Sequence, residues 1–160
     1  MKNNSLLILI ILCISFIFLN SFMNADQSKE ESGRIVKAIE KVVNTLYKDN
    51  TPEKVTRFLK TTFNNILRDL AHFLEFLILG ILTMLYSYRF KSTVFKRVSL
   101  VLFFCILIAL IDEIIQFFSP GRAMELYDLL LDSSGSIIGI ILILLLHKIK
   151  EKRKCRGIPK

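Results

Sequence analysis

Residues 98–118, with the sequence VSLVLFFCILIALIDEIIQFF, form an apolar run that is charged only near its end. A helix needs about 20 mainly apolar residues to cross the hydrocarbon core of a bilayer. The run therefore predicts a membrane-spanning helix. Its Asp112, Glu113 and Gln116 predict polar groups that lie inside the membrane.

Three further apolar runs of similar length occur in the chain, at about residues 6–23, 66–88 and 126–146. The chain has 160 residues, of which 52% are hydrophobic and 22% are charged. These two groups are separated along the chain instead of interleaved, which is typical of an integral membrane protein. We expect an all-α membrane bundle of four transmembrane helices, formed by a single domain over residues 1–160.

The first apolar run has two interpretations. Lys2 precedes it and residues 23–25 loosely suit a cleavage site, as in a signal peptide. The run is longer than the usual signal-peptide core of about 7–15 residues, however. We therefore expect an uncleaved transmembrane helix.

Residues 26–65, between the first and second runs, mix charged and apolar side chains. Five apolar residues recur there at helical spacing: Ile35, Ile39, Val42, Val43 and Leu46. This pattern predicts an amphipathic helix on the membrane surface or over the bundle. A second amphipathic stretch at residues 55–63 predicts a helix that continues into the second span.

The basic residues predict the orientation of the chain. Residues 89–97 hold four basic residues and no acid, and the tail, residues 147–160, is strongly basic. The positive-inside rule places both segments in the cytoplasm, so both termini are cytoplasmic and residues 26–65 are extracellular. Residues 26–65 also contain lysines, but these are mixed with acids, and longer loops obey the rule less strictly. The net charge of +8 thus serves orientation, and we expect no nucleic-acid partner.

Polar side chains lie inside the last three spans and in the turn between the last two. The set is Arg68, His72, Glu75, Asp112, Glu113, Gln116, Arg122, Asp128 and Asp132. At 1.5 Å per residue, five of them lie at similar depth, roughly 10 Å from the predicted outer face: His72, Glu75, Asp112, Glu113 and Asp132. In each span they share one side of the helix, so we expect the three helices to turn them toward one another.

Asp128, Asp132, Gly135 and Gly139 share one face of the fourth span. The two glycines form a small-xxx-small motif, which allows the backbone of a neighbouring helix to approach closely. We therefore expect the carboxylate face of this span to be its packing face as well.

A charged residue in a spanning helix costs about 2.5–3.5 kcal/mol on insertion scales, so these groups should face each other or water. Arg68 and Arg122 could pair with carboxylates and serve structure alone. The acids outnumber the basic groups, however, and the surplus acids should hold or share protons or bind a cation. Such a cluster is typical of a functional site.

The remaining sequence excludes some kinds of chemistry. The spacing of Cys13, Cys105 and Cys155 predicts neither a disulfide nor a cysteine metal site. No nucleophilic serine or cysteine motif is present, so we expect no covalent catalysis.

Three motifs resemble those of VanZ-like membrane proteins. Residues 68–76 resemble their K/R-x-x-A-H-F-x-E-Y stretch, residues 112–122 their D-E-x-x-Q…P-G-R motif, and residues 128–139 their D-x-x-x-D/N-x-x-G-x-x-x-G helix. Ile115 stands where many members have histidine, and Phe76 where tyrosine is usual. The first difference argues against a mechanism that needs a histidine on the third span.

The resemblance implies a bacterial cell-membrane location and a link to resistance against teicoplanin-type glycopeptide antibiotics. These antibiotics act on cell-wall precursors outside the membrane, in agreement with a polar site near the outer face. We expect the site to bind or act on a lipid-linked or cell-wall-related molecule. The resemblance implies no settled reaction.

As a membrane enzyme, the protein would use two groups of side chains. The predicted catalytic residues are His72, Glu75, Asp112, Glu113 and Asp128, and the predicted substrate-binding residues are Arg68, Gln116, Arg122 and Asp132. His72 would carry a proton or ligate a metal, and Arg122 would bind an anionic head group. A divalent cation bridging the carboxylates is compatible with their oxygen ligands.

Two other functions fit the same residues. In a binding or shielding protein, the polar groups would recognise antibiotic or lipid, and residues 35–63 would form a lid at the membrane surface. In a proton-coupled transporter, the acids would relay protons. Four spans are few for alternating access and no inverted repeat is visible, so a transporter is the weakest hypothesis.

Overall fold

The protein is described by a computed structural model that covers residues 2–22, 25–47, 52–120 and 125–155. Its four long helices are α1 (Lys2–Ser21), α4 (Asn64–Ser87), α5 (Val94–Phe118) and α6 (Leu126–Cys155). Each contains, or forms part of, a helical stretch long and apolar enough to cross a membrane. The predicted all-α bundle with four spans is confirmed, and the protein is a multi-pass membrane protein.

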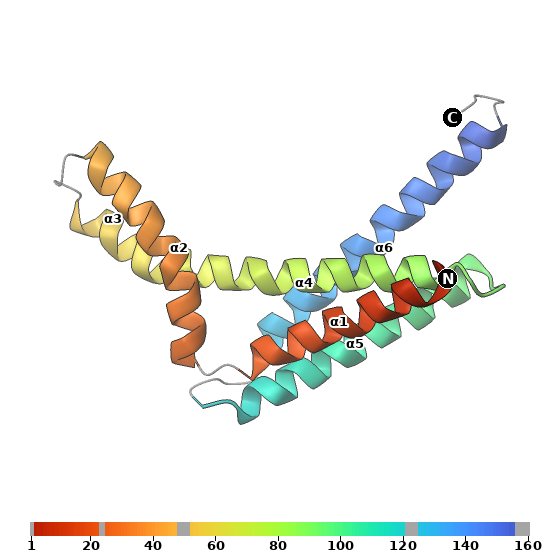
Figure 1. The fold of residues 1–160 in the computed structure, drawn as a ribbon, viewed down its shortest axis with the longest axis horizontal. Helices are drawn as coiled ribbons and strands as arrows, with labels where there is room; N and C mark the ends of the chain where they lie inside the picture. The colour runs from red at the N-terminus through yellow and green to blue at the C-terminus, as the bar shows by residue number, and fades with distance from the viewer. Residues whose placement is uncertain (1, 23–24, 48–51, 121–124, 156–160) are drawn as a thin grey trace.

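Three further helical elements lie between the first two spans: α2 (Ala25–Leu46), α3 (Glu53–Phe58) and the π-helix η1 (Leu59–Phe63). α3, η1 and α4 follow one another without a break, so the predicted continuation into the second span is confirmed. The predicted amphipathic helix is α2, which packs against η1 and α4. In Figure 1, α2 and α3 project from the end of α4 where α4 begins.

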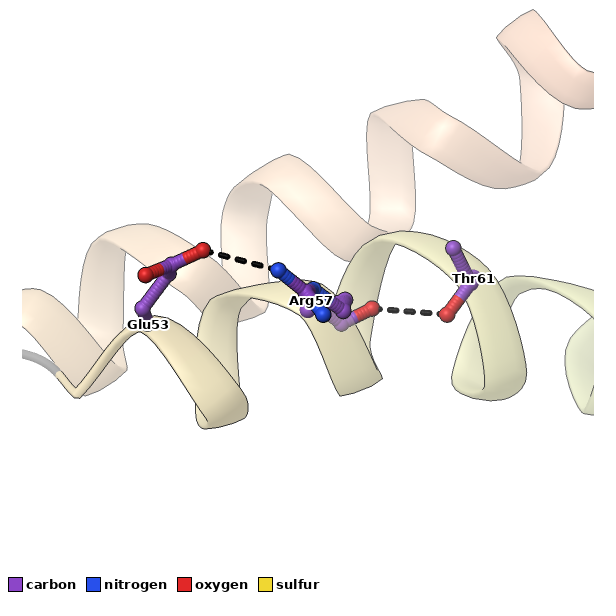
Figure 2. Close-up of polar contacts among 3 residues, drawn as sticks. All are labelled: Glu53, Arg57 and Thr61. Atoms are coloured by element: carbon purple, nitrogen blue, oxygen red, sulfur yellow. Dashed lines mark hydrogen bonds and ion pairs between the residues drawn. The ribbon is translucent and has the colours of Figure 1, made fainter.

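Ion pairs on this projecting part are mostly exposed. Lys60 Nζ lies 3.1 Å from Glu40 Oε1 and joins η1 to α2. Within α3, Arg57 pairs with Glu53 at 2.8 Å, and the hydroxyl of Thr61 on η1 donates to the Arg57 carbonyl oxygen at 2.8 Å (Figure 2). Exposed pairs of this kind contribute at most about 1 kcal/mol each. They therefore stabilise this segment slightly and do not hold the bundle together.

α4 occupies the middle of the bundle (Figure 1). α1 and α5 run side by side along one flank of it, and α6 crosses it and makes the most extensive contact. The buried apolar core draws on all four long helices and includes Ile17, Phe76, Leu79, Met84, Cys105, Ala109 and Ile140. Apolar side chains also cover the outside, including Leu12, Phe103 and Ile138. An apolar exterior of this extent suits contact with lipid.

Glycine allows α4 and α6 to approach closely. A Cβ atom added at Gly80 would lie 2.5 Å from the Ser136 backbone oxygen. One added at Gly135 would lie under 3.0 Å from the Phe73 backbone oxygen, and Gly139 is as closely packed against α4. The predicted packing face of the fourth span is confirmed, and Gly80 on α4 is its counterpart.

At the opposite end of the bundle, aromatic rings and an arginine side chain join α4, α5 and α6. The Tyr88 and His147 rings stack with centroids 4.4 Å apart, and the Arg97 guanidinium carbon lies 4.2 Å from the Tyr88 ring centroid. These contacts join the end of α4, the start of α5 and the middle of α6. α6 continues to Cys155, well past residue 146 where the span was predicted to end. Its 30 residues make a helix about 45 Å long, longer than the roughly 30 Å hydrocarbon core.

Candidate functional site

The predicted polar residues meet at the end of the bundle where α1 and α5 finish and α4 and α6 begin. We call the eight predicted residues that the structure describes the polar cluster: Arg68, His72, Glu75, Asp112, Glu113, Gln116, Asp128 and Asp132. Six of them are buried, while Arg68 and Glu75 are partly exposed. The ninth predicted residue, Arg122, lies outside the described residues.

Two side chains donate hydrogen bonds to Asp112. It is wholly buried. The Ser21 hydroxyl donates to one of its carboxylate oxygens, and Gln116 Nε2 donates to the other at 2.7 Å. Ser21 is itself fixed, because the Ser119 hydroxyl donates to its carbonyl oxygen at 2.8 Å. The end of α1 is thereby joined to the end of α5, and the Asp112 carboxylate has one defined orientation.

Glu75 is held from α1. Asn20 Nδ2 donates to Glu75 Oε1 at 2.7 Å, a hydrogen bond that crosses from the last turn of α1 to α4. Bonds of this kind between membrane helices contribute about 0.6 kcal/mol on average and up to about 2. Its effect here is mainly to fix where the carboxylate lies.

Arg68 and Asp128 form the outer edge of the cluster. Arg68 Nη2 lies 3.8 Å from Asp128 Oδ2, and the two side chains are 31% and 12% exposed. The long distance and the partial exposure describe a loose ion pair between α4 and α6. The structural interpretation, in which arginine neutralises an acid, therefore holds for this pair and accounts for one acid of the cluster.

Glu113 and Asp132 are both buried, but of the two only Glu113 accepts a hydrogen bond from the described residues. Glu113 Oε2 accepts a hydrogen bond from the Glu125 backbone N–H at 3.0 Å, while its Oε1 accepts none from the described residues. Asp132 is 1% exposed, and neither of its carboxylate oxygens accepts a hydrogen bond within the described residues. A buried polar group without a partner is costly. Among the described residues, no hydrogen-bond donor therefore accounts for a carboxyl group at Asp132.

His72, Asp112 and Asp132 come together from three different helices. Each offers one ligand atom, and these atoms lie within 4.8 Å of one another. All three residues are buried. The sequence predicted that these residues share a depth, and their proximity confirms that they also face one another. The arrangement brings an imidazole and two carboxylates to one point inside the membrane-spanning region.

A groove of about 540 Å³ lies elsewhere, near the basic loop between α4 and α5. Its lining is mainly apolar, with Lys91, Lys96 and Arg97 among the polar side chains along it. No member of the polar cluster lines it. Buried charge, and not concavity, therefore identifies the cluster as the candidate site.

The prediction from sequence missed three contributors to the site. Asn20 and Ser21 supply side-chain donors from α1, and Glu125 supplies a backbone donor. Asn20 and Ser21 carried a usable signal, since they are adjacent polar residues at the end of an apolar run and at the depth of the cluster. The Glu125 contact is made by a backbone N–H and has no side-chain signal.

Taken together, these features define a four-span helical membrane protein with polar groups buried where the ends of four helices meet. The family model described as VanZ/LLP1 matches residues 6–147. The chain therefore belongs to the VanZ/LLP1 family, and the resemblance drawn from its motifs is confirmed. Searches of curated proteins and of solved structures found no match to the chain.

Proposed function

We propose that this protein contributes to resistance against teicoplanin-type glycopeptide antibiotics by binding or acting on a lipid-linked or cell-wall-related molecule at the polar cluster. The observation that carries the proposal is the burial of three carboxyl groups together, at Asp112, Glu113 and Asp132, which are 0%, 0% and 1% exposed. Acids inside a membrane are costly and typically mark sites of binding or proton transfer. Membership of the VanZ/LLP1 family supports the link to resistance.

The side chains divide into two proposed roles. Those that would exchange protons with the substrate or orient it for reaction are His72, Glu75, Asp112, Glu113 and Asp128. Those that would hold its polar head group are Arg68, Gln116, Arg122 and Asp132. Glu113 is the favoured acid–base group, because one oxygen is fixed by the Glu125 N–H and the other accepts no hydrogen bond from the described residues. Arginine suits a phosphate group because its planar fork can bind two oxygens at once.

The proposed orientation places the cluster near the outer face of a bacterial cell membrane. The cluster and the basic loop at residues 89–97 lie toward opposite ends of α5. If that loop is cytoplasmic, as the positive-inside rule favours, both termini are cytoplasmic too. A fluorescent protein fused after residue 160 should then fluoresce, and a cysteine introduced by Glu53→Cys should react with a membrane-impermeant thiol reagent on intact cells. A reactive C-terminal cysteine tag together with an unreactive Glu53→Cys would reverse the orientation.

The substitution Glu113→Gln tests the site directly. It keeps the size of the side chain and removes its negative charge. We expect cells that express it to become as sensitive to teicoplanin as cells without the protein, at an unchanged amount of protein in the membrane. Glu53→Gln is the matched control, because it removes an acid whose side chain is 85% exposed, and it should retain full resistance. Full resistance in Glu113→Gln would refute the proposal.

Sequestration without catalysis is the second candidate. The observation that favours it is the apolar stripe of α2, on which Ile35, Val42 and Leu46 are 53%, 60% and 76% exposed. A stripe of this kind could cover a bound lipid or antibiotic at the membrane surface. Mass spectrometry of membrane lipids separates the two functions. An altered lipid that disappears in Glu113→Gln supports an enzyme, whereas unchanged lipids with resistance proportional to the amount of protein support sequestration.

A further inference from the structure

The three-residue group of His72, Asp112 and Asp132 has the dimensions of a metal site. Its ligand atoms lie within 4.8 Å of one another. Nitrogen and oxygen ligands lie about 2.0–2.2 Å from a Zn²⁺ ion, so ligands around one ion are about 3–4 Å apart. A contraction of at most about 0.8–1.8 Å in these distances would therefore bring all three ligand atoms into coordination.

Asp132 supplies the second, independent observation. Its side chain belongs to this group, it is 1% exposed, and neither carboxylate oxygen accepts a hydrogen bond from the described residues. A buried carboxylate needs a hydrogen-bond donor or a cation. The ion pair of Arg68 goes to Asp128 instead. A divalent ion at this point would compensate the charge of Asp132.

Asp112 is supported as metal ligands usually are. Its two oxygens are oriented by Ser21 and by Gln116 Nε2, at 2.7 Å for the latter. Each carboxylate oxygen has two lone pairs, so an oxygen that accepts one hydrogen bond can still bind an ion. Outer-shell donors of this kind fix the direction of a ligating carboxylate.

We propose that His72, Asp112 and Asp132 bind one divalent transition-metal ion, with Zn²⁺ preferred over Mg²⁺ and Ca²⁺. An imidazole and two carboxylates suit Zn²⁺, whereas Mg²⁺ and Ca²⁺ prefer ligand sets made only of oxygen. Two carboxylates and a divalent ion also sum to zero charge, which favours a buried site. The proposal rests on the proposed function in using the same cluster, and it adds the ligand chemistry.

The proposed ion also suggests the substrate class. Three protein ligands leave a coordination position open, and in catalytic sites this position takes water or substrate. A phosphate oxygen of a lipid head group is the ligand that such a position in a membrane would accept.

Metal binding can be measured without any resistance assay. The full-length protein is purified in detergent, stripped with a chelator and titrated with ZnCl₂, with metal content measured by mass spectrometry. We expect one Zn²⁺ per chain. Asp132→Asn and His72→Gln should each weaken binding at least about 100-fold, and Gln116→Leu about 10–100-fold, as outer-shell losses do. Asp69→Asn is the matched control on α4, because Asp69 is a partly buried acid outside the three-residue group, and it should bind as the wild type does.

The two proposals fail in different ways. No stoichiometric Zn²⁺ binding by a wild-type protein that confers resistance would overturn the metal site and leave the proposed function standing. Equal affinity in Asp132→Asn, His72→Gln and wild type would overturn the metal site as well. Stoichiometric binding that both variants lose supports it, including when the protein confers no resistance. Helicity and gel-filtration profiles are measured for every variant, and His72→Gln supplies the result if Asp132→Asn does not fold.

Discussion

The close contact between α4 and α6 leads to a prediction for Gly80→Ala. Gly80 faces the backbone of Ser136, and an added Cβ would lie 2.5 Å from the Ser136 oxygen and 2.9 Å from its Cα. Both atoms belong to a helix backbone and neither can rotate away. The substitution must therefore push the two helices apart. Gly33→Ala is the matched control, because Gly33 is also helical and nothing lies within 4 Å of its added Cβ.

The size of the effect follows from the displacement. Ordinary contact begins at 3.4 Å, so α4 and α6 must separate by about 0.9 Å at Gly80. Forcing an extra methyl group into a packed interior costs about 1–3 kcal/mol. Replacing glycine by alanine inside a helix gains about 0.8–1.0 kcal/mol, and both variants share this gain. We therefore expect Gly80→Ala to be about 1–3 kcal/mol less stable than Gly33→Ala.

The free energy of unfolding can be measured by titrating sodium dodecyl sulfate into protein in mixed micelles while helicity is recorded. Gly33→Ala should unfold at or above the wild-type midpoint, and Gly80→Ala below the Gly33→Ala midpoint. The separation should also reach the polar cluster, because α4 carries His72 and α6 carries Asp132. Zn²⁺ affinity should therefore fall in Gly80→Ala alone. Equal midpoints for the two alanine variants would refute the reasoning about α4 and α6.

Two further substitutions test single contacts by the same titration. Ser21→Ala removes a donor from the wholly buried Asp112 and should cost about 1–3 kcal/mol, whereas Ser15→Ala, at an exposed position of the same helix, should change little. An equal effect of both would contradict a special role for Ser21. Lys60→Gln removes the ion pair with Glu40 and should cost less than about 1 kcal/mol, with a smaller difference at high salt. A larger, salt-independent loss would show that this pair supports the fold.

The four spans could be predicted from the sequence because a bilayer leaves few alternatives. A long apolar segment must satisfy its backbone internally, and a helix is the way one segment can do so. The same periodicity placed His72 and Asp132 on inward faces, and it placed the Gly135 and Gly139 pair at a helix contact. These features depend on one helix at a time, so one sequence was enough to find them.

Features that depend on the packing of two helices were harder to predict from the sequence. A single glycine such as Gly80 has several uses, and its role follows only from Ser136 arriving opposite it. Asn20 and Ser21 are visible as polar residues at the end of a span, but their partners Glu75 and Asp112 follow only from how α1 packs against α4 and α5. The ring stack of Tyr88 and His147 joins residues that are far apart in sequence. In each case the missing information was the register of one helix against another.

The helix dipole and the polar contacts stabilise the buried acids Asp128, Asp112 and Asp132 to different degrees. Asp128 lies in the first turn of α6, where the positive end of the helix dipole favours an acid, and it also pairs with Arg68. Asp112 lies before the last turn of α5, where the dipole effect has faded, but Ser21 and Gln116 donate to it.

Asp132 has neither form of support. It lies beyond the first turn of α6, where the dipole effect has faded, and it accepts no hydrogen bond from the described residues. In metal-free protein, Asp132→Asn should therefore unfold at or above the wild-type detergent midpoint, whereas Asp112→Asn should unfold below it because its Ser21 and Gln116 contacts are weakened. A substitution that raises stability while it removes binding indicates that the residue serves function at a cost in stability. A large destabilisation by Asp132→Asn would show instead that this carboxyl group serves the fold.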